Sequence, residues 1–264
     1  MSIPESARVV YRKNPLVEVI CQVRYPAIFR IEQEYPTTFQ DRISSDFPIA
    51  QEKNIVMQIP LEVLRALPEV VQRSLPLARA YEFSSRDGLW TVSLTRDFLA
   101  LSTKQYHKWE EFRNLLRKCL NALQEVYAPP FYLRIGLRYQ DIISRHALGL
   151  RDVEWAELLN PGIAGELGDP HLANDVQERF TVTLLRLPAH DAVVRMQHGL
   201  VQFAGGENDS KEICYLIDCD LFTEQQTEAQ DVFHILDYLN RQAGNLFRYF
   251  ISERLQSALQ PEPA

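Results

Sequence analysis

The segment Ile213–Phe222 carries two carboxylates, Asp218 and Asp220, in a pattern typical of a β-strand. Residues two apart on a strand share a face, so both carboxylates would project from the same side of a sheet. Paired carboxylates can bind a divalent cation or perform general acid–base chemistry. However, the spacing fixes no third acidic residue, and Arg24 or Arg138 could simply neutralise the pair. We therefore expect no metal site and no cofactor.

Arginines occupy equivalent positions in other expected strands. The chain has 22 Arg but only six Lys, and Arg binds carboxylate or phosphate through two parallel hydrogen bonds. Gly136, between two of these Arg, leaves room for something bulky. The polar strand face is either a groove for a small anionic ligand or, the favoured interpretation, a solvated face with cross-strand ion pairs. The candidate ligand-binding residues are Glu18, Arg24, Arg134, Arg138, Arg195, Asp218 and Asp220.

Comparison with enzyme patterns gives no support for catalysis. Triphosphate-tunnel enzymes carry alternating Glu, Glu and Lys on their first strand, but this chain has Glu18, Ile20 and Gln22. The sequence contains no GxSxG, P-loop, GxGxxG or HExxH motif, and its six histidines are scattered. We expect no catalytic residue, so a hydrolase of a phosphorylated substrate is the least favoured hypothesis.

The overall charge argues against nucleic acid as a partner. The formal net charge is −7, and binding to nucleic acid is driven largely by positive charge. The best basic cluster, Arg113, Arg117 and Lys118 on a predicted helix, is interrupted by Glu110 and Glu111. A solvated helix face explains this pattern better than a nucleic-acid interface.

The cysteines and the apolar runs indicate a cytoplasmic protein. Each cysteine lies within an apolar run without metal-ligand spacing, which is typical of a small buried hydrophobe; they are Cys21, Cys119, Cys214 and Cys219. The N-terminus has no apolar stretch typical of a signal peptide. No apolar run approaches the roughly 18 residues that cross a bilayer, so we expect no membrane partner.

Hydrophobic periodicity predicts the elements that must position these residues. Alternation predicts half-buried strands, and stripes at helical spacing predict two long helices. Thr103 would cap the first long helix, and a capping box from Thr227 to Gln230 would start the second, which Gly244 could bend. The expected strands are 16–25, a piece near 55–59, 80–85, 90–95, 98–103, 131–143, 179–187, 192–203 and 213–222. The expected helices are a short one after Pro36, 104–127, 152–159 and 227–259.

The element order repeats along the chain. Both halves, 1–128 and 129–264, give strand, helix, three strands, helix. Pro15 precedes Arg24-Tyr25 by the same interval as Pro129 precedes Arg138-Tyr139, 114 residues later. We predict an α+β fold in which a duplicated β-α-β-β-β-α unit forms one pseudo-twofold domain, a mostly antiparallel sheet packed by two long helices. The alternative is two α+β lobes that share an order by coincidence.

Several short motifs carry a family resemblance. The segment Lys13-Asn14-Pro15-Leu16-Val17-Glu18-Val19 resembles the N-terminal signature Asn-x-Pro-[Val/Leu]-x-Glu-[Val/Ala] of a sporadically distributed bacterial family of uncharacterised proteins. Similarity continues at Leu137-Arg138-Tyr139, where Asp141 stands in place of the family's Asn, at Leu216–Asp220, and in the final helix at Leu236, Phe247 and Ile251. The resemblance implies no enzymatic activity. It implies an accessory gene of a mobile or phage-defence locus.

Three functional hypotheses follow, in order of preference. The first is a non-catalytic binding or assembly protein that works through its polar strand face or its final helix, as a homo-oligomer or with another protein. The second is a small anionic-ligand binder with an Arg-lined cleft between the two copies, by analogy with duplicated effector-binding modules. The third is the phosphate-substrate hydrolase using Asp218 and Asp220.

Overall fold

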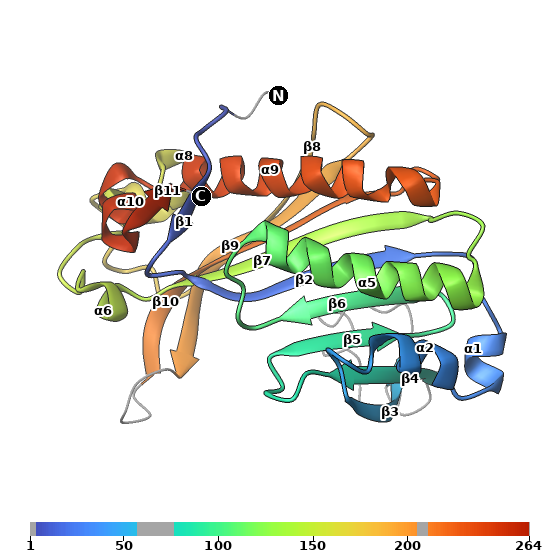
Figure 1. Ribbon diagram of the computed structural model, residues 1–264. Helices are drawn as coiled ribbons and strands as arrows, with labels where there is room; N and C mark the ends of the chain where they lie inside the picture. The colour runs from blue at the N-terminus through green and yellow to red at the C-terminus, as the bar shows by residue number, and fades with distance from the viewer. Residues whose placement is uncertain (1–3, 57–76, 205–210, 264) are drawn as a thin grey trace.

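A computed structural model describes residues 4–56, 77–204 and 211–263. Within these residues, nine strands form one antiparallel sheet in the order β3-β4-β5-β6-β2-β7-β10-β9-β8, and β1 pairs with β11 in a separate small sheet (Figure 1). The strands are β1 (Val9–Tyr11), β2 (Leu16–Arg24), β3 (Ile49–Val56), β4 (Leu77–Ser84), β5 (Trp90–Leu94), β6 (Phe98–Thr103), β7 (Arg134–Ile143), β8 (Phe180–Arg186), β9 (Val193–Ala204), β10 (Lys211–Thr223) and β11 (Pro261–Pro263).

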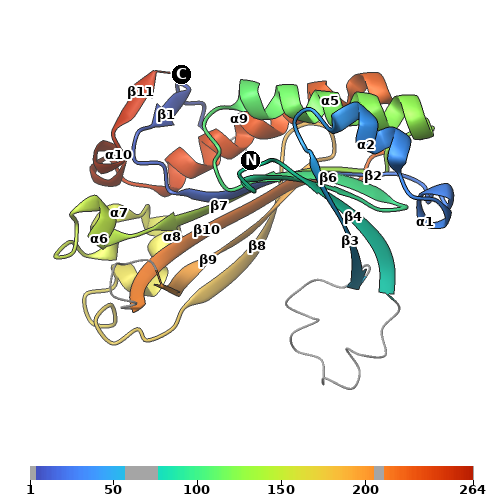
Figure 2. The ribbon, with the colours of Figure 1, turned by 60° about the horizontal axis from the view of Figure 1, so that its bottom comes forward.

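Two helices of 19 residues each, α5 (Trp109–Tyr127) and α9 (Val232–Phe250), cover one face of the large sheet. Figure 2 shows the sheet curving away from them, with β3 and β4 on one side and β8 and β9 on the other. We call the side of the sheet opposite α5 and α9 the open face. The other helices among the described residues are α1 (Arg30–Gln33), α2 (Thr37–Ile43), α6 (Arg145–Leu148), α7 (Trp155–Leu158), α8 (Pro161–Ala164) and α10 (Glu253–Leu259), with 3-10 turns η1 (Gly165–Gly168) and η2 (Ala229–Asp231).

The core lies between the sheet and the two helices. Strand β2, at the centre of the sheet, buries Val19, Cys21 and Val23 completely beneath the helices and leaves Gln22 on the open face. Apolar side chains at helical spacing complete the core from above, and they include Phe112, Leu116 and Leu123 of α5 and Leu236, Leu239 and Leu246 of α9. Each such side chain contributes roughly 1.5–3 kcal/mol through its burial. All four cysteines are buried and free, as their apolar surroundings predicted.

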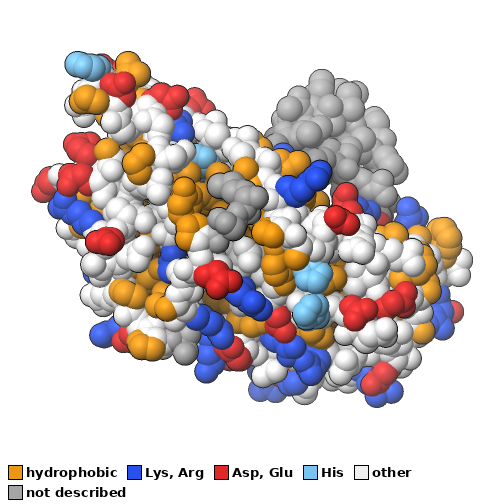
Figure 3. All heavy atoms as spheres, turned by 90° about the horizontal axis from the view of Figure 1, so that it is seen from above, with side chains coloured by type: hydrophobic (Ala, Val, Ile, Leu, Met, Phe, Trp, Pro, Cys, Tyr) orange, Lys and Arg blue, Asp and Glu red, His pale blue; other side chains and the backbone are white. Residues whose placement is uncertain are grey.

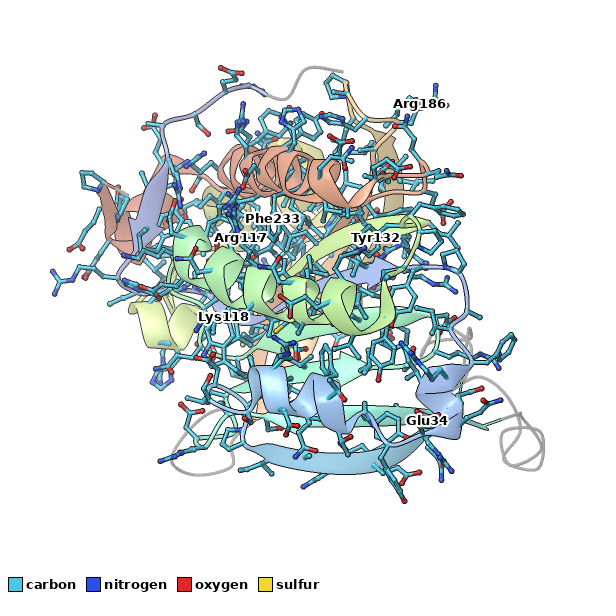
Figure 4. All side chains as sticks on the ribbon, turned by 45° about the vertical axis from the view of Figure 1, so that its right-hand side comes forward. Glu34, Arg117, Lys118, Tyr132, Arg186 and Phe233 are labelled. Atoms are coloured by element: carbon cyan, nitrogen blue, oxygen red, sulfur yellow. The ribbon has the colours of Figure 1, made fainter. Side chains whose placement is uncertain are left out.

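The helices also contact each other through side chains that looked solvent-facing in sequence. The guanidinium carbons of Arg113 and Arg117 on α5 each lie 4.8 Å from the ring centroid of Phe233 on α9 (Figure 4). Two members of the predicted basic cluster therefore pack between helices.

The mixed α/β fold with a large antiparallel sheet is confirmed, and most strands begin and end within a few residues of their predicted bounds. The turn at Asp87-Gly88 connects β4 and β5 as predicted, and Gly88 adopts a left-handed conformation with φ of +70°. Of the strand piece predicted near 55–59, Ile55 and Val56 belong to β3, and residues 57–59 lie outside the described part of the chain.

Three predicted helix boundaries are wrong. Helix α5 begins at Trp109, since the backbone of Lys108 is still extended, with φ of −148° and ψ of 157°. The Thr103 hydroxyl instead accepts a hydrogen bond from the amide of Gln105 in the preceding loop. Thr227 does not cap α9; its hydroxyl donates to the carbonyl of Gln225 and its backbone pairs with Tyr132. The predicted final helix also ends early, since α9 stops before Ile251.

Ile251 separates the last two helices. Its backbone is extended, with φ of −104° and ψ of 147°, and it forms a β-bridge with Leu159. Ser252 then caps α10 by accepting from the amide of Leu255. The long C-terminal helix is thus two helices, and Gly244 lies inside the unbroken first one. No helix among the described residues is both long and apolar enough to cross a membrane.

Candidate functional site

The open face brings together four of the seven residues predicted from sequence. On β7 and β10, Arg138 donates two hydrogen bonds to Asp218, from Nε to Oδ1 at 2.8 Å and from Nη2 to Oδ2 at 2.5 Å. Gln140 donates to the same carboxylate at 3.0 Å. The Asp218 side chain is only 4% exposed, so this carboxylate is buried with its partners already in place.

The second carboxylate is paired in a similar way. Arg134 Nη2 donates to Asp220 Oδ2 at 2.8 Å, and the Arg134 guanidinium carbon lies 4.3 Å from the centroid of the Phe222 ring. A Cβ atom added at Gly136 would lie 2.3 Å from Arg134 Nη1. The room that the sequence suggested at Gly136 is therefore filled by the neighbouring arginine.

The other three predicted residues do not join this group. Arg24 pairs with Asp97 at 3.3 Å. Glu18 stands opposite Gln140 in the β2–β7 ladder, and Arg195 stands opposite Asp220 in the β9–β10 ladder. Neither has an ion pair or side-chain hydrogen bond with any described residue. The open face thus holds cross-strand ion pairs whose groups largely satisfy one another.

A cavity of about 420 Å³ lies on the other side of the sheet. Its walls are the N-terminal segment before β2, the loop that leads into α5, and α9, while β7 supplies Tyr139 and Asp141. Figure 3 looks down on the side that carries α9, where hydrophobic side chains are exposed among clusters of Arg, Lys, Asp and Glu. None of the seven predicted site residues lines this cavity.

Asp141 is the unusual group in the cavity. The residue is only 6% exposed, yet no described residue forms a hydrogen bond or an ion pair with its carboxylate. Burial, together with the negative charge of nearby Asp218, raises the pKa of Asp141 well above its usual value. A buried carboxyl without a partner is costly unless it meets a ligand or keeps its proton.

Aromatic side chains line the same cavity as this carboxyl. The Tyr139 hydroxyl donates to Asn240 Oδ1 at 2.9 Å, and its ring meets that of Tyr106 edge-on at 5.7 Å. The Tyr11 hydroxyl is buried and has no hydrogen-bond partner among the described residues. Burial raises the pKa of Tyr11 and raises that of Tyr106 to about 12, so both hydroxyls keep their protons near neutral pH.

The chain matches no protein-family model and no curated protein. The family resemblance in the sequence therefore stays a prediction. In this chain Asn14 directly precedes Pro15, without the intervening residue of the family signature. Asn14, Pro15, Tyr139 and Asp141, which belong to the motifs that carried the resemblance, nevertheless all line the cavity.

Most charged side chains at the cavity form hydrogen bonds or ion pairs with other residues. Arg8 and Glu110 form two hydrogen bonds of 2.5 and 2.7 Å, which lower the pKa of Glu110 to about 2. Asp237 accepts from Trp109 Nε1 at 2.7 Å and from Arg113 at 2.9 and 3.1 Å. Arg248 donates to Asn245 at 3.2 Å, and burial lowers its pKa. Unlike these groups, Asp141 has no hydrogen bond or ion pair with a described residue.

The sequence does not predict this cavity, but β7 contains one signal for it. On β7, alternate residues Ile135, Leu137, Tyr139 and Ile143 face the helices and are buried. Asp141 belongs to the same set of alternate residues, so it is a carboxylate at a position where the pattern requires an apolar side chain. A violation of this kind marks a functional or strained position.

Proposed function

We propose that the protein is a non-catalytic binding protein for a small molecule, and that the cavity beneath α9 is its binding site. The observation that carries this proposal is Asp141, a residue only 6% exposed whose carboxyl lines a cavity of about 420 Å³ and has no partner among the described residues. Cavities that bind small ligands are mostly apolar with a few converging polar groups, and about 300–1,000 Å³ in size. A ligand that hydrogen-bonds to Asp141 recovers the free energy lost when this carboxyl is buried alone.

The lining favours a flat ligand with a cationic or N–H donor end. Tyr106, Trp109 and Tyr11 offer ring faces and edges, and aromatic groups pack well against such surfaces. In the same cavity the ionised Asp141 carboxylate can accept hydrogen bonds, and a planar amidine can donate two in parallel. This ligand differs from the anionic one expected from the open-face arginines, because Arg134 and Arg138 are already paired with Asp220 and Asp218.

Calorimetric titration with benzamidine tests the proposal. We expect saturable binding of benzamidine, no binding of benzoate, and affinity weakened about tenfold or more by Asp141→Asn, because a charged hydrogen bond is lost. Asp237→Asn is the matched control: it removes a carboxylate of the same cavity that Arg113 already pairs, and it should leave binding nearly unchanged. Equal binding by wild type and Asp141→Asn, or a preference for benzoate, would overturn the proposal.

The raised pKa of Asp141 adds an independent readout. A cationic ligand stabilises the ionised carboxylate, so binding below the raised pKa must release a proton. Titrations in two buffers of different ionisation enthalpy measure this release. We expect release from the wild type and none from Asp141→Asn.

We propose further that the two halves, 1–128 and 129–264, arose by duplication into one pseudo-twofold domain. Supporting this, the order β6-β2-β7-β10 pairs, within the large sheet, the first strand of each half with the last strand of that half. Each of these last strands is followed by a 19-residue helix, α5 or α9. On this view the cavity lies between the two copies, because its walls come from both.

The hydrolase hypothesis has less support. Its two carboxylates, Asp218 and Asp220, each accept from an arginine on β7, so neither is available as a general base without breaking an ion pair. The first hypothesis also included self-assembly. That part concerns the edge of the sheet and not the cavity.

A further inference from the structure

We propose that two copies of this chain pair along β8, antiparallel about a twofold axis at Val182, so that their two large sheets join into one. Strand β8 is an edge of the sheet, with β9 as its partner. An edge strand presents a row of backbone N–H and C=O groups that can pair with another chain. The proposal is independent of the cavity and of its ligand.

The backbone of β8 is arranged for such pairing. The Arg179 carbonyl accepts from the Leu200 amide, and the Leu187 amide donates to the Ala192 carbonyl. Odd-numbered residues of β8 therefore direct their backbone groups toward β9, since these groups alternate along an antiparallel ladder. The even-numbered residues direct theirs outward, where no described residue pairs with them.

The same even-numbered residues expose apolar side chains. Phe180 is 51% exposed, Val182 is 53% exposed and Leu184 is 64% exposed. Natural edges are normally protected by charge, Pro or a bulge, but residues 180–185 contain no charged residue and no Pro. The opposite edge strand, β3, is protected, because its Glu52 and Lys53 form ion pairs with the neighbouring strand β4.

Charge complementarity selects the register. With the axis at Val182, Val182 faces its own copy, Phe180 faces the partner's Leu184, and Glu178 faces the partner's Arg186. Glu178 and Arg186 are exposed and have no ion pair with a described residue, and Figure 4 shows Arg186 at the periphery of the molecule. An axis one residue earlier or later places both charges opposite uncharged residues. The twofold supplies the Glu178–Arg186 pair twice.

Light scattering of the full chain during size-exclusion chromatography, with sedimentation to obtain the dissociation constant, tests the proposal. We expect a wild-type dimer. Val182→Lys places two like charges on the axis and should weaken the dimer about 100-fold or more. Ile49→Lys, the matched control on the exposed opposite edge, should leave the dimer intact. A wild type that is monomeric at about 100 μM, or a dimer insensitive to Val182→Lys, would overturn the proposal.

Charge exchange tests the register. Glu178→Arg and Arg186→Glu should each weaken the dimer about 5- to 30-fold, because each creates two like-charge contacts. The double exchange should restore the wild-type dissociation constant to within about threefold. Failure of the double variant to recover would overturn the register. Circular dichroism of each variant confirms folding, which we expect because these side chains are exposed.

Discussion

Asp218 and Asp141 lie close together on neighbouring strands but on opposite faces of the same sheet. Both are nearly buried, with 3% and 6% of the residue exposed. On the open face Asp218 accepts from Arg138 and Gln140, whereas no described residue pairs with Asp141 on the helix-covered face. Asp218 therefore contributes to holding strands β7 and β10 together, while Asp141 retains its capacity to bind something else.

The largest effect is expected when the paired carboxylate is removed. Asp218→Ala leaves Arg138 without its bidentate partner and should lower the free energy of unfolding by about 2–3 kcal/mol, less than for a fully buried pair because the Arg138 side chain is 36% exposed. Urea denaturation measures this loss. Asp220→Ala should lower the free energy of unfolding by only about 1 kcal/mol, because the Arg134 guanidinium still packs on the Phe222 ring. Equal losses of stability in the two variants would contradict the idea that the greater burial of Asp218 makes its ion pair more important for the fold.

Removing the unpaired carboxylate of Asp141 should raise the free energy of unfolding instead of lowering it. The folded-state pKa of Asp141 is raised, so the native protein still holds this proton when unfolded Asp has lost its own near pH 4. Stability therefore falls as pH rises from about 4 to the raised pKa, and stays lower above it. Asp141→Asn removes this loss and should raise the free energy of unfolding at pH 7 by about 1–2 kcal/mol. Urea titrations from pH 4 to 8 test the sign.

The two faces also differ in how far the sequence predicts them. Strict alternation in β2 and β10 places Gln22, Asp218 and Asp220 on the open face correctly, because side-chain direction is a local property. The pairing of Arg134 with Asp220 and of Arg138 with Asp218 needs the strand order, which joins β7 to β10 across about 80 residues. Local pattern therefore identifies the residues of the network but not their partners.

The cavity is less predictable still. One wall is the N-terminal segment, which the contacts of Ser6 with Asn245 and of Arg8 with Glu110 hold in place. These contacts join residues 239 and 102 positions apart, and no periodicity encodes them. Likewise, the end of α9 depends on the bridge between Ile251 and Leu159, which a helical stripe cannot reveal. The sequence reveals only that Asp141 is a charged residue among the alternate, otherwise apolar residues of β7 that face the helices.

A smaller effect is expected on the open face at Gly136. Gly136→Ala places a Cβ where the Arg134 guanidinium now lies, so Arg134 must leave Asp220 or Phe222. We expect a loss of about 1 kcal/mol in the free energy of unfolding, measured by urea denaturation. In the Arg134→Ala background the same substitution should cost less, because the obstruction is gone. An equal cost in both backgrounds would show that the backbone, not Arg134, requires glycine.

The smallest effect on stability belongs to the cavity wall. Arg8 and Glu110 are both about half exposed, so Arg8→Ala should lower the free energy of unfolding by less than about 0.5 kcal/mol. The pKa of Glu110 is lowered to about 2, so this small contribution is present above about pH 4.5 and is lost as pH falls toward 2. Arg8→Ala should return the Glu110 pKa toward its ordinary value, which carboxylate NMR titration measures.

Affinity should respond more than stability to the same change. Arg8 anchors the segment that encloses the cavity, and the ligand must keep that segment ordered to retain its contacts. We therefore expect Arg8→Ala to weaken benzamidine binding several-fold while the urea midpoint barely moves. Unchanged affinity would mean that the hydrogen bonds of Ser6 with Asn245 and with Arg248 hold the N-terminal segment in place without Arg8. On the open face, by contrast, we expect substitutions in the ion pairs to change stability and not ligand affinity. The reason is that these residues hold the sheet together and do not line the cavity.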